Sequence, residues 1–363
     1  MLVDNANTEQ KVPAKRTSRS IAALAVVSAL LLAACGSSSS ATKSGSGSAE
    51  SVKVRLGYFP NVTHATAIIG VQKGLFAKAL GTDELDPKTF ADGTAASEAL
   101  SAGAIDAAYI GSGPAINLFQ KSGGKAIRIV SGATSGGASL VVKPSIASGK
   151  DFKGKTLSTP KLGNTQDVSL RSWLKRRGYP TTTTGGGDVK IAPQENSQTL
   201  DAFKAGTIDG AWVPEPWATR LVVEGGGKVL VDERDLFPNH QFVTTHLIVA
   251  TKFLDAHPDA VKRLIEGQVA ANAYVNANGA ASQTVVNGAI KKITGKDLKP
   301  EVIRRAWKNL EFTDDPIARS LQTAADAAAA VKLLDSSDVK GIYDLTILNG
   351  IFKAKGEPAV KGL

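Results

Sequence analysis

The sequence is poor in the residues from which metal centres and covalent cross-links are usually built. It has one cysteine and four histidines among 363 residues. A single cysteine excludes an intrachain disulfide framework and any zinc site made of several cysteines. The histidines lack metal-ligand spacing, and neither H-E-x-x-H nor a G-x-S-x-G nucleophile elbow occurs. The sequence therefore predicts no metal, no cofactor and no catalytic residue.

A phosphate-binding loop is also disfavoured, although its letters occur once. Residues 149–156, GKDFKGKT, match G-x-x-x-x-G-K-[ST]. That motif works only when it follows a strand and opens a helix, so that its N–H groups surround the phosphates. Here the Gly-Lys-Thr opens a predicted strand, TLSTP, and we interpret the match as accidental.

Long apolar runs are scarce, and the clearest one lies near the N-terminus. Ile21–Ala34 is too short for a usual membrane-spanning helix but has the length of a signal-peptide core, and basic residues precede it. It ends in Leu-Ala-Ala-Cys35, which resembles the lipobox of bacterial lipoproteins. The resemblance implies a signal peptide over 1–34 and a lipid on Cys35; a free thiol in a plain signal peptide or signal anchor is the alternative. Residues 36–51, rich in Gly and Ser, are predicted to be a flexible tether. The protein is then exported and lipid-anchored to the outer face of the bacterial cytoplasmic membrane.

The charge is moderately positive. Beyond residue 34 the chain carries 39 Lys and Arg against 31 Asp and Glu, a net charge of +8. An excess of this size favours an anionic ligand or an anionic membrane surface. Nucleic acid is disfavoured, because the basic residues are scattered and no arginine-aromatic motif is present.

One short unit occurs twice. AGAIDAAYIGSGPA at 102–115 and AGTIDGAWVPEPWA at 205–218 share their first part and differ at the end. The separation is close to the size of one small domain and too long for a solenoid repeat. The shared part is interpreted as scaffold, and the different endings as two working loops that hold different sides of a ligand.

Predicted strands and helices alternate from Val52 onwards. This order indicates sheets with helices on both faces. We expect an α/β protein of two lobes, each a mostly parallel sheet flanked by helices, with a hinge of two crossing strands near 141–144 and 244–249. Residues 52–142 and 246–363 form lobe 1, and residues 143–245 form lobe 2.

The candidate site residues follow predicted strands, where open α/β sheets bind ligands. Helix N-termini at these places carry free N–H donors and suit anions. Several of these residues have a plain structural alternative: Ser112 and Asn164 as ordinary helix caps, Asn164 with Asp167 as a capping-box variant, and Trp217 as core. Glu215 could meet a ligand amine, pair with a basic residue or serve as a hinge contact. The predicted ligand-binding residues are Tyr58, Asn61, Thr63, His64, Ser112, Gly113, Gly137, Ala138, Asn164, Thr165, Gln166, Glu215 and Trp217.

Five stretches together resemble the solute-binding proteins of ABC importers, in the nitrate, aliphatic sulfonate and taurine-binding group. They are LGYFPNVTHA, AGAIDAAYIGSGPAINLF, GATSGGASLVVK, LGNTQDVSLRSWLKRRGY and WVPEPWATRLV, and the similarity runs from about Val52 to Phe352. The resemblance implies a type II periplasmic-binding fold and a monomer that delivers a small oxyanion to a membrane permease driven by a separate ATPase subunit.

The ligand implied first is an aliphatic sulfonate. Nitrate, bicarbonate, taurine and a pyrimidine precursor of thiamine are alternatives. An exported enzyme on the same scaffold, with Glu215 and His64 as its only titratable pair, and a sensor or adhesion lipoprotein are the rival classes. A related branch of pyrimidine-making enzymes has a cysteine-rich segment, which this chain lacks.

Overall fold

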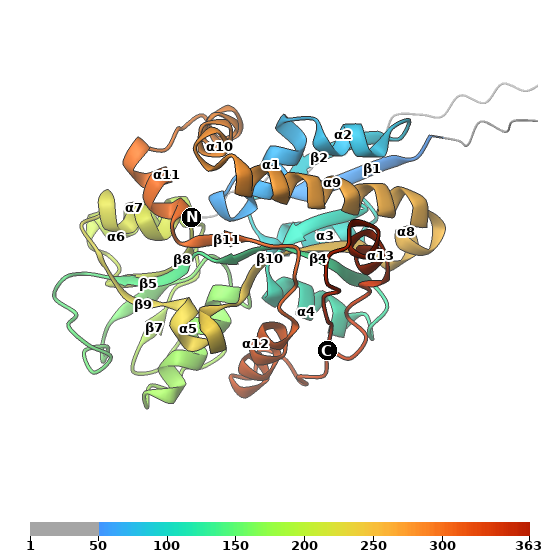
Figure 1. The fold of residues 1–363 in the computed structure, drawn as a ribbon. Coiled ribbons are helices and arrows are strands. Elements are labelled where there is room, and N and C mark those ends of the chain that lie inside the picture. Colours follow the sequence, from blue (N-terminus) through green and yellow to red (C-terminus); the bar gives the residue numbers. More distant parts are fainter. Residues whose placement is uncertain (1–50) are drawn as a thin grey trace, which may run out of the picture. The chain divides into compact units, whose positions relative to one another are not determined.

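The computed structural model describes residues 51–363, which form one compact unit (Figure 1). The predicted signal peptide, Cys35 and nearly all of the predicted tether lie outside the described residues. No helix within 51–363 is long and apolar enough to cross a membrane.

Six strands form the first sheet, in the order β11-β4-β10-β3-β1-β2. β1 pairs in parallel with β2 and β3, whereas β10 runs antiparallel to β3 and β4, and β11 antiparallel to β4. The strands are β1 (Lys53–Tyr58), β2 (Glu84–Thr89), β3 (Ala107–Ile110), β4 (Ile127–Gly136), β10 (Val243–Ala250) and β11 (Leu310–Phe312).

Five strands form the second sheet, in the order β7-β6-β8-β5-β9. β6 is parallel to β7 and β8, and β5 is antiparallel to β8 and β9. Both sheets are therefore mixed, and the expectation of mostly parallel sheets needs correction at β5, β10 and β11. The strands are β5 (Ala138–Val142), β6 (Thr156–Ser158), β7 (Lys190–Ile191), β8 (Gly210–Pro214) and β9 (Lys228–Asp232).

Helices cover both faces of each sheet, as the alternation predicts (Figure 1). Helices follow each of β1, β2, β3, β6 and β7. Their bounds are α1 (Ala65–Gln72), α2 (Leu75–Leu80), α3 (Gly93–Ser101), α4 (Ser112–Lys121), α5 (Thr165–Arg176), α6 (Asn196–Ala205), α7 (Trp217–Val223), α8 (Thr251–Ala256), α9 (Pro258–Ala277), α10 (Gly279–Thr294), α11 (Pro300–Trp307), α12 (Ala318–Ala330) and α13 (Thr346–Lys355).

The chain crosses between the sheets earlier than expected. β4 ends at Gly136 and β5 begins at Ala138, and the return lies between β9 and β10. The predicted crossings at 141–144 and 244–249 are wrong, because those segments pair within one sheet. Gly137 suits the first crossing: its φ is +75°, and a Cβ there would lie 2.1 Å from Leu310 Cδ2. Which residues move together as a rigid lobe stays a prediction.

The repeated unit has the same structural role in each lobe. The Asp106 carboxylate accepts a hydrogen bond from the Arg55 N–H of β1 at 2.9 Å. The Asp209 carboxylate accepts from the Thr156 N–H of β6, also at 2.9 Å. Each aspartate thus fastens the start of the strand that follows it to the start of a neighbouring parallel strand. The shared half of the repeat is scaffold, in agreement with the prediction.

Candidate ligand-binding site

Loops at the carboxyl ends of five strands surround a cavity of about 50 Å³, hereafter the ligand cavity. Residues following β1, β2, β3 and β6, the end of β8 and the start of β10 contribute to it. Its lining consists of Phe59, Asn61, Thr63, His64, Gly93, Gly111, Pro114, Asn164, Thr165, Gln166, Pro214, Thr244 and Thr245. Both lobes therefore contribute walls to one small cavity.

The N-termini of α4 and α5 meet beside this cavity. The Gly113 N–H in the first turn of α4 donates to Thr165 Oγ1 at 3.0 Å, and Thr165 is the first residue of α5. The first N–H groups of a helix have no intrahelical acceptor, and each helix N-terminus carries about half a positive charge. Two such ends pointing toward the same cavity favour an anion between them.

The start of α5 is held by a buried carboxylate. Asp167 accepts hydrogen bonds from Thr159 Oγ1 at 2.9 Å, the Gly163 N–H at 2.9 Å and Arg171 Nε at 2.8 Å. Asn164 is the residue before the helix, but its side chain does not cap it. The alternative reading of Asn164 as a side-chain cap is therefore wrong: Asp167 reaches back to Gly163, and Asn164 lines the cavity.

The segment after β1 supplies a neutral ring to the cavity. The Phe59 N–H donates to His64 Nδ1 at 3.3 Å, so the proton of the neutral imidazole sits on Nε2. Burial lowers the pKa of His64 to about 3. The His64 ring is therefore neutral near pH 7 and offers an N–H donor.

No lysine, arginine, aspartate or glutamate lines the ligand cavity within the described residues. Glu215 is buried, but its carboxylate accepts from the Thr219 N–H, Thr219 Oγ1 and Asn309 Nδ2, the last at 2.7 Å. Burial raises the pKa of Glu215. The Trp217 Nε1–H donates to Asn61 Oδ1 at 3.1 Å. Glu215 and Trp217 thus make contacts between segments of the two lobes and do not line the ligand cavity.

The structure brings together about half of the predicted site residues. Asn61, Thr63, His64, Asn164, Thr165 and Gln166 line the ligand cavity, while Ser112 and Gly113 line a neighbouring one with α12. Tyr58, Gly137 and Ala138 are not among the lining residues, and Tyr58 packs in the core of the first sheet. The lining residues that the sequence did not single out are Phe59, Gly93, Gly111, Pro114, Pro214, Thr244 and Thr245.

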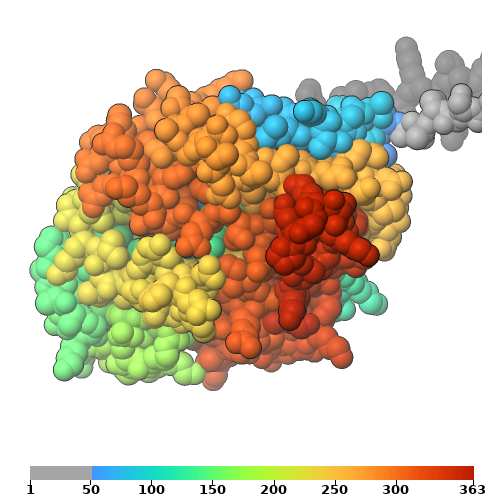
Figure 2. Space-filling view, in the orientation of Figure 1, coloured from blue at the N-terminus to red at the C-terminus, as the bar shows by residue number. Residues whose placement is uncertain are grey.

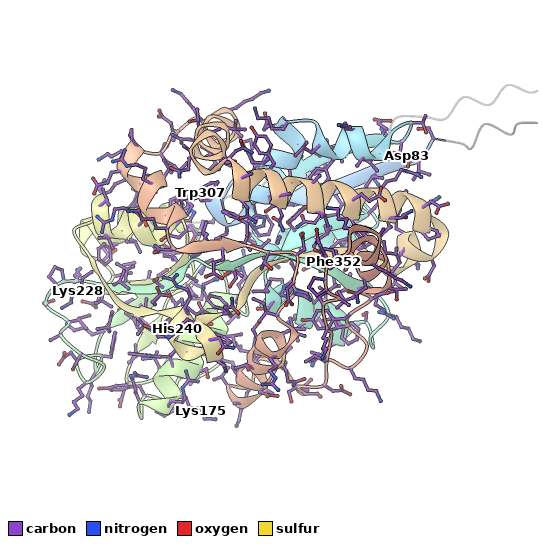
Figure 3. The ribbon with its side chains drawn as sticks, in the orientation of Figure 1. Asp83, Lys175, Lys228, His240, Trp307 and Phe352 are labelled. Carbon is purple, nitrogen blue, oxygen red and sulfur yellow. The ribbon has the colours of Figure 1, made fainter. Side chains whose placement is uncertain are left out.

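The lobes also touch away from the cavity. Lys175 Nζ on α5 donates to the Ala330 carbonyl at the end of α12, at 2.6 Å, and Lys175 lies at the lower side of the second-sheet lobe in Figure 3. In the space-filling view the orange-red residues of α12 lie against the green residues of α5 along the lower edge of the visible face (Figure 2). The structure therefore has its lobes in contact.

Comparison with known proteins gives a family. The model of the NMT1-like family matches residues 47–287, more than half of the chain. A Brucella abortus protein named "Putative binding protein" is 30% identical over 60% of this chain and 65% of its own length. The chain thus spans about two thirds of that relative. A Bacillus subtilis protein named "Putative aliphatic sulfonates-binding protein" is 26% identical over 88% of this chain and 92% of its own length.

Solved structures share the fold. The alkanesulfonate-binding protein SsuA of Xanthomonas axonopodis, bound to MOPS, aligns with a TM-score of 0.66 at 20% identity, over 80% of this chain and 96% of its own. The periplasmic nitrate-binding protein NrtA of Synechocystis aligns with a TM-score of 0.70 at 16% identity, over 86% of this chain and 92% of its own. A Candida albicans protein described as having the generic periplasmic binding protein fold aligns with a TM-score of 0.60 at 12% identity, over 85% of this chain and 96% of its own. The two lobes therefore form a periplasmic-binding-protein fold.

Proposed function

The chain belongs to the NMT1-like family, and we propose that it is the extracytoplasmic substrate-binding component of an ABC importer. It captures a small oxyanion between its lobes and delivers it to a membrane permease driven by an ATPase subunit. The observation that carries this proposal is the ligand cavity: two helix N-termini meet beside a space lined only by neutral side chains.

An anion loses its water shell on entering such a space, so several oriented donors must replace it. The Thr165 and Gln166 N–H groups of α5, the His64 Nε2–H and the side-chain amides of Asn164 and Gln166 can supply them. The ligand bridges both lobes and so stabilises the closed arrangement relative to the open one.

An aliphatic sulfonate is the first candidate ligand. The relative with that name aligns along most of both chains. A cavity of about 50 Å³ holds an oxyanion headgroup, since a cavity of about 10–15 Å³ by the same measure already holds one water molecule. A long tail needs the lobes to separate further, so we expect short-chain sulfonates to bind best, with nitrate, bicarbonate and taurine as the alternatives.

Binding without chemistry is favoured over an exported enzyme. His64 is the one titratable side chain among the lining residues within 51–363, and Glu215 is occupied by Thr219 and Asn309. Acid–base catalysis needs a titratable group placed at the reacting atom with a pKa near the working pH. His64, with its pKa lowered to about 3, does not meet this need.

We further propose that Cys35 carries a lipid that holds the exported protein at the membrane. The basis is the Leu-Ala-Ala-Cys sequence after a signal-peptide-like run. Cys35→Ala is expected to release the protein from membranes washed with salt. Retention of that variant on the salt-washed membrane would contradict lipidation.

A thermal-shift series tests the ligand. The protein truncated to residues 36–363 would be measured with methane-, ethane- and hexanesulfonate, taurine, nitrate and bicarbonate. A ligand at about 100 times its Kd stabilises the fold by roughly 2.7 kcal/mol, which raises the Tm by a few degrees. A rise with short sulfonates alone supports the first candidate, and a rise with nitrate or bicarbonate alone replaces it.

Isothermal titration of the best ligand, with product analysis, separates binding from turnover. The appearance of product would support the enzyme alternative. No response to any of these anions would overturn the oxyanion proposal and leave the fold assignment standing.

A further inference from the structure

A large groove lies at the end of the first sheet opposite to the ligand cavity. It has a volume of about 710 Å³ and lies where the parallel strands β1 and β3 begin, and it is hereafter called the basic groove. Arg55 near the start of β1, Asp106 just before β3 and Ala126 just before β4 line it, together with residues of α8. The ligand cavity lies at the other ends of these strands.

The rim of the groove is positively charged. Lys121 at the end of α4, Lys125 in the connection to β4 and Lys252 on α8 line it, and all three are exposed. None of them forms an ion pair with a carboxylate of residues 51–363. Asp106 is the one acidic residue in the lining, and Arg55 binds it through Nε at 2.8 Å. Counting Arg55 and the three lysines against Asp106, the lining keeps a net charge of +3.

The floor of the groove is apolar. Leu100, Ile105, Leu118 and Phe253 contribute to it between the basic residues. An apolar floor below a cationic rim suits an amphiphile with an anionic head. The headgroup and glycerol region of an anionic bilayer has this order of polarity.

The groove also lies where the chain enters the fold. β1 begins at Lys53, and Arg55 lies two residues further along the strand, about 6–7 Å away. Residues 36–51 connect this edge to Cys35, and sixteen residues reach at most about 53–58 Å however they fold. A lipid on Cys35 would therefore keep the basic groove within that reach of the membrane surface.

We propose that the basic groove docks on anionic phospholipid headgroups of the membrane that carries the lipid anchor. The choice of a membrane lipid as the occupant rests on the lipidation of Cys35 proposed above. The charge of the groove and its place in the fold do not depend on that lipidation. Docking at this edge turns the ligand cavity, at the opposite edge of the first sheet, away from the bilayer and toward the solution. One weak anchor and one basic surface together bind a membrane more firmly than either alone.

Vesicle binding without the lipid anchor tests the proposal. Residues 50–363 form a compact unit with their own cores, so the protein truncated to residues 36–363 keeps the whole described fold. We expect it to sediment with phosphatidylcholine vesicles that contain phosphatidylglycerol, to be released by salt, and not to bind pure phosphatidylcholine vesicles. Each lysine near an anionic surface contributes about 1 kcal/mol, or roughly a fivefold change in partition coefficient.

The matched variants carry the same change of charge. Lys121→Glu/Lys125→Glu/Lys252→Glu is expected to abolish vesicle binding. Lys153→Glu/Lys190→Glu/Lys204→Glu, at exposed positions of the second-sheet lobe, is expected to retain most of it. Equal loss in both variants would mean that net charge alone acts, and undiminished binding of the first variant would exclude the groove.

Folding and ligand binding are read separately. Both triple variants should keep the Tm and the anion affinity of the parent, and if the first one unfolds, the Lys→Gln set replaces it. Failure of the groove proposal therefore leaves the oxyanion proposal untouched. If the protein binds vesicles but no anion, the oxyanion proposal fails and the groove proposal stands.

Discussion

The Gly113 N–H of α4 donates to the Thr165 hydroxyl of α5 at 3.0 Å, and this bond joins the two lobes beside the ligand cavity. Neither helix could approach so closely with a larger residue at position 113. A Cβ there would lie 2.7 Å from the Thr165 backbone N and 3.1 Å from the Gly163 carbonyl O. Glycine at 113 thus permits the contact of two helix N-termini on which the proposed anion site depends.

Gly113→Ala is expected to weaken ligand binding by holding the lobes apart. Overpacking of this kind costs about 1–3 kcal/mol, or at least a fivefold loss of affinity, because the penalty falls on the closed state. Isothermal titration measures the affinity, and small-angle scattering with ligand shows whether the protein still closes. Gly288→Ala on α10, where a Cβ meets nothing within 4 Å, is the control; an equal loss in both variants would contradict a role in closure.

Trp217→Phe is expected to weaken anion binding by about two- to tenfold, because it removes a contact between the lobes that stabilises the closed arrangement. The change removes the Nε1–H that donates to Asn61 Oδ1 at 3.1 Å but keeps an aromatic ring beneath the Arg220 guanidinium, 4.7 Å from the ring centre. A hydrogen bond of this type contributes about 0.5–1.5 kcal/mol. A double-mutant cycle with Asn61→Ala should show that the two losses do not add. Additive losses would instead indicate that Trp217 acts independently of Asn61, for example by contacting the ligand.

The order of strands and helices could be predicted from the sequence because β-branched runs and glycine-closed helices recur along it. β2 escaped prediction, since ELDPKT is an exposed edge strand with charges and Pro87 and has no apolar alternation. The direction of β10 could not be predicted either. An apolar run gives the burial of a strand but not its direction, and β10 pairs antiparallel with both neighbours.

The candidate site was predicted where local rules apply. Asn61, His64 and Gln166 follow predicted strands and do line the cavity. Thr244 was missed because it lies at the start of β10, just after the return crossing, and the position of that crossing depends on sheet pairing between distant segments. The sequence alone could not exclude the capping alternative for Asn164, because either Asn164 or Asp167 could serve the start of α5, and only the position of Gly163 decides between them.

Asp167→Asn is expected to destabilise the fold strongly. Asp167 and Arg171 are 0% and 1% exposed, and removing one charge of a buried pair leaves the other without compensation. Such changes lower the free energy of unfolding by about 3–5 kcal/mol. Unfolding in urea measures this decrease. Glu301→Gln, which breaks the exposed Arg305–Glu301 pair, should cost no more than about 1 kcal/mol. Similar losses in both variants would mean that the buried pair has no special role.

Glu233 makes stability depend on pH. Its carboxylate accepts from Ser169 Oγ at 2.6 Å and Trp212 Nε1 at 2.7 Å, and burial raises its pKa from 4.5 to about 7. The native state therefore holds a proton between these values that the unfolded chain has released. The proton on Glu233 therefore contributes to the free energy of unfolding. This contribution is fully present below pH 4.5 and is lost as the pH rises through about 7.

Glu233→Gln is expected to flatten this dependence. The amide can still accept from Trp212 and donate to the Ser169 hydroxyl, so the variant keeps both hydrogen bonds without a titrating group. Melting temperatures would be measured from about pH 5 to pH 8, and the Tm of the parent minus the Tm of the variant should fall with rising pH. Other groups act equally on both proteins: burial raises the pKa of Glu215 and, to about 6, that of Asp314, and lowers the pKa of His64 and His246 to about 3. With rising pH these carboxyls lower the stability and the histidines raise it, so only the difference between the two curves reports on Glu233. Parallel curves would mean that Glu233 is ionised in the fold, and the buried carboxylate would then need a compensating donor beyond Ser169 and Trp212.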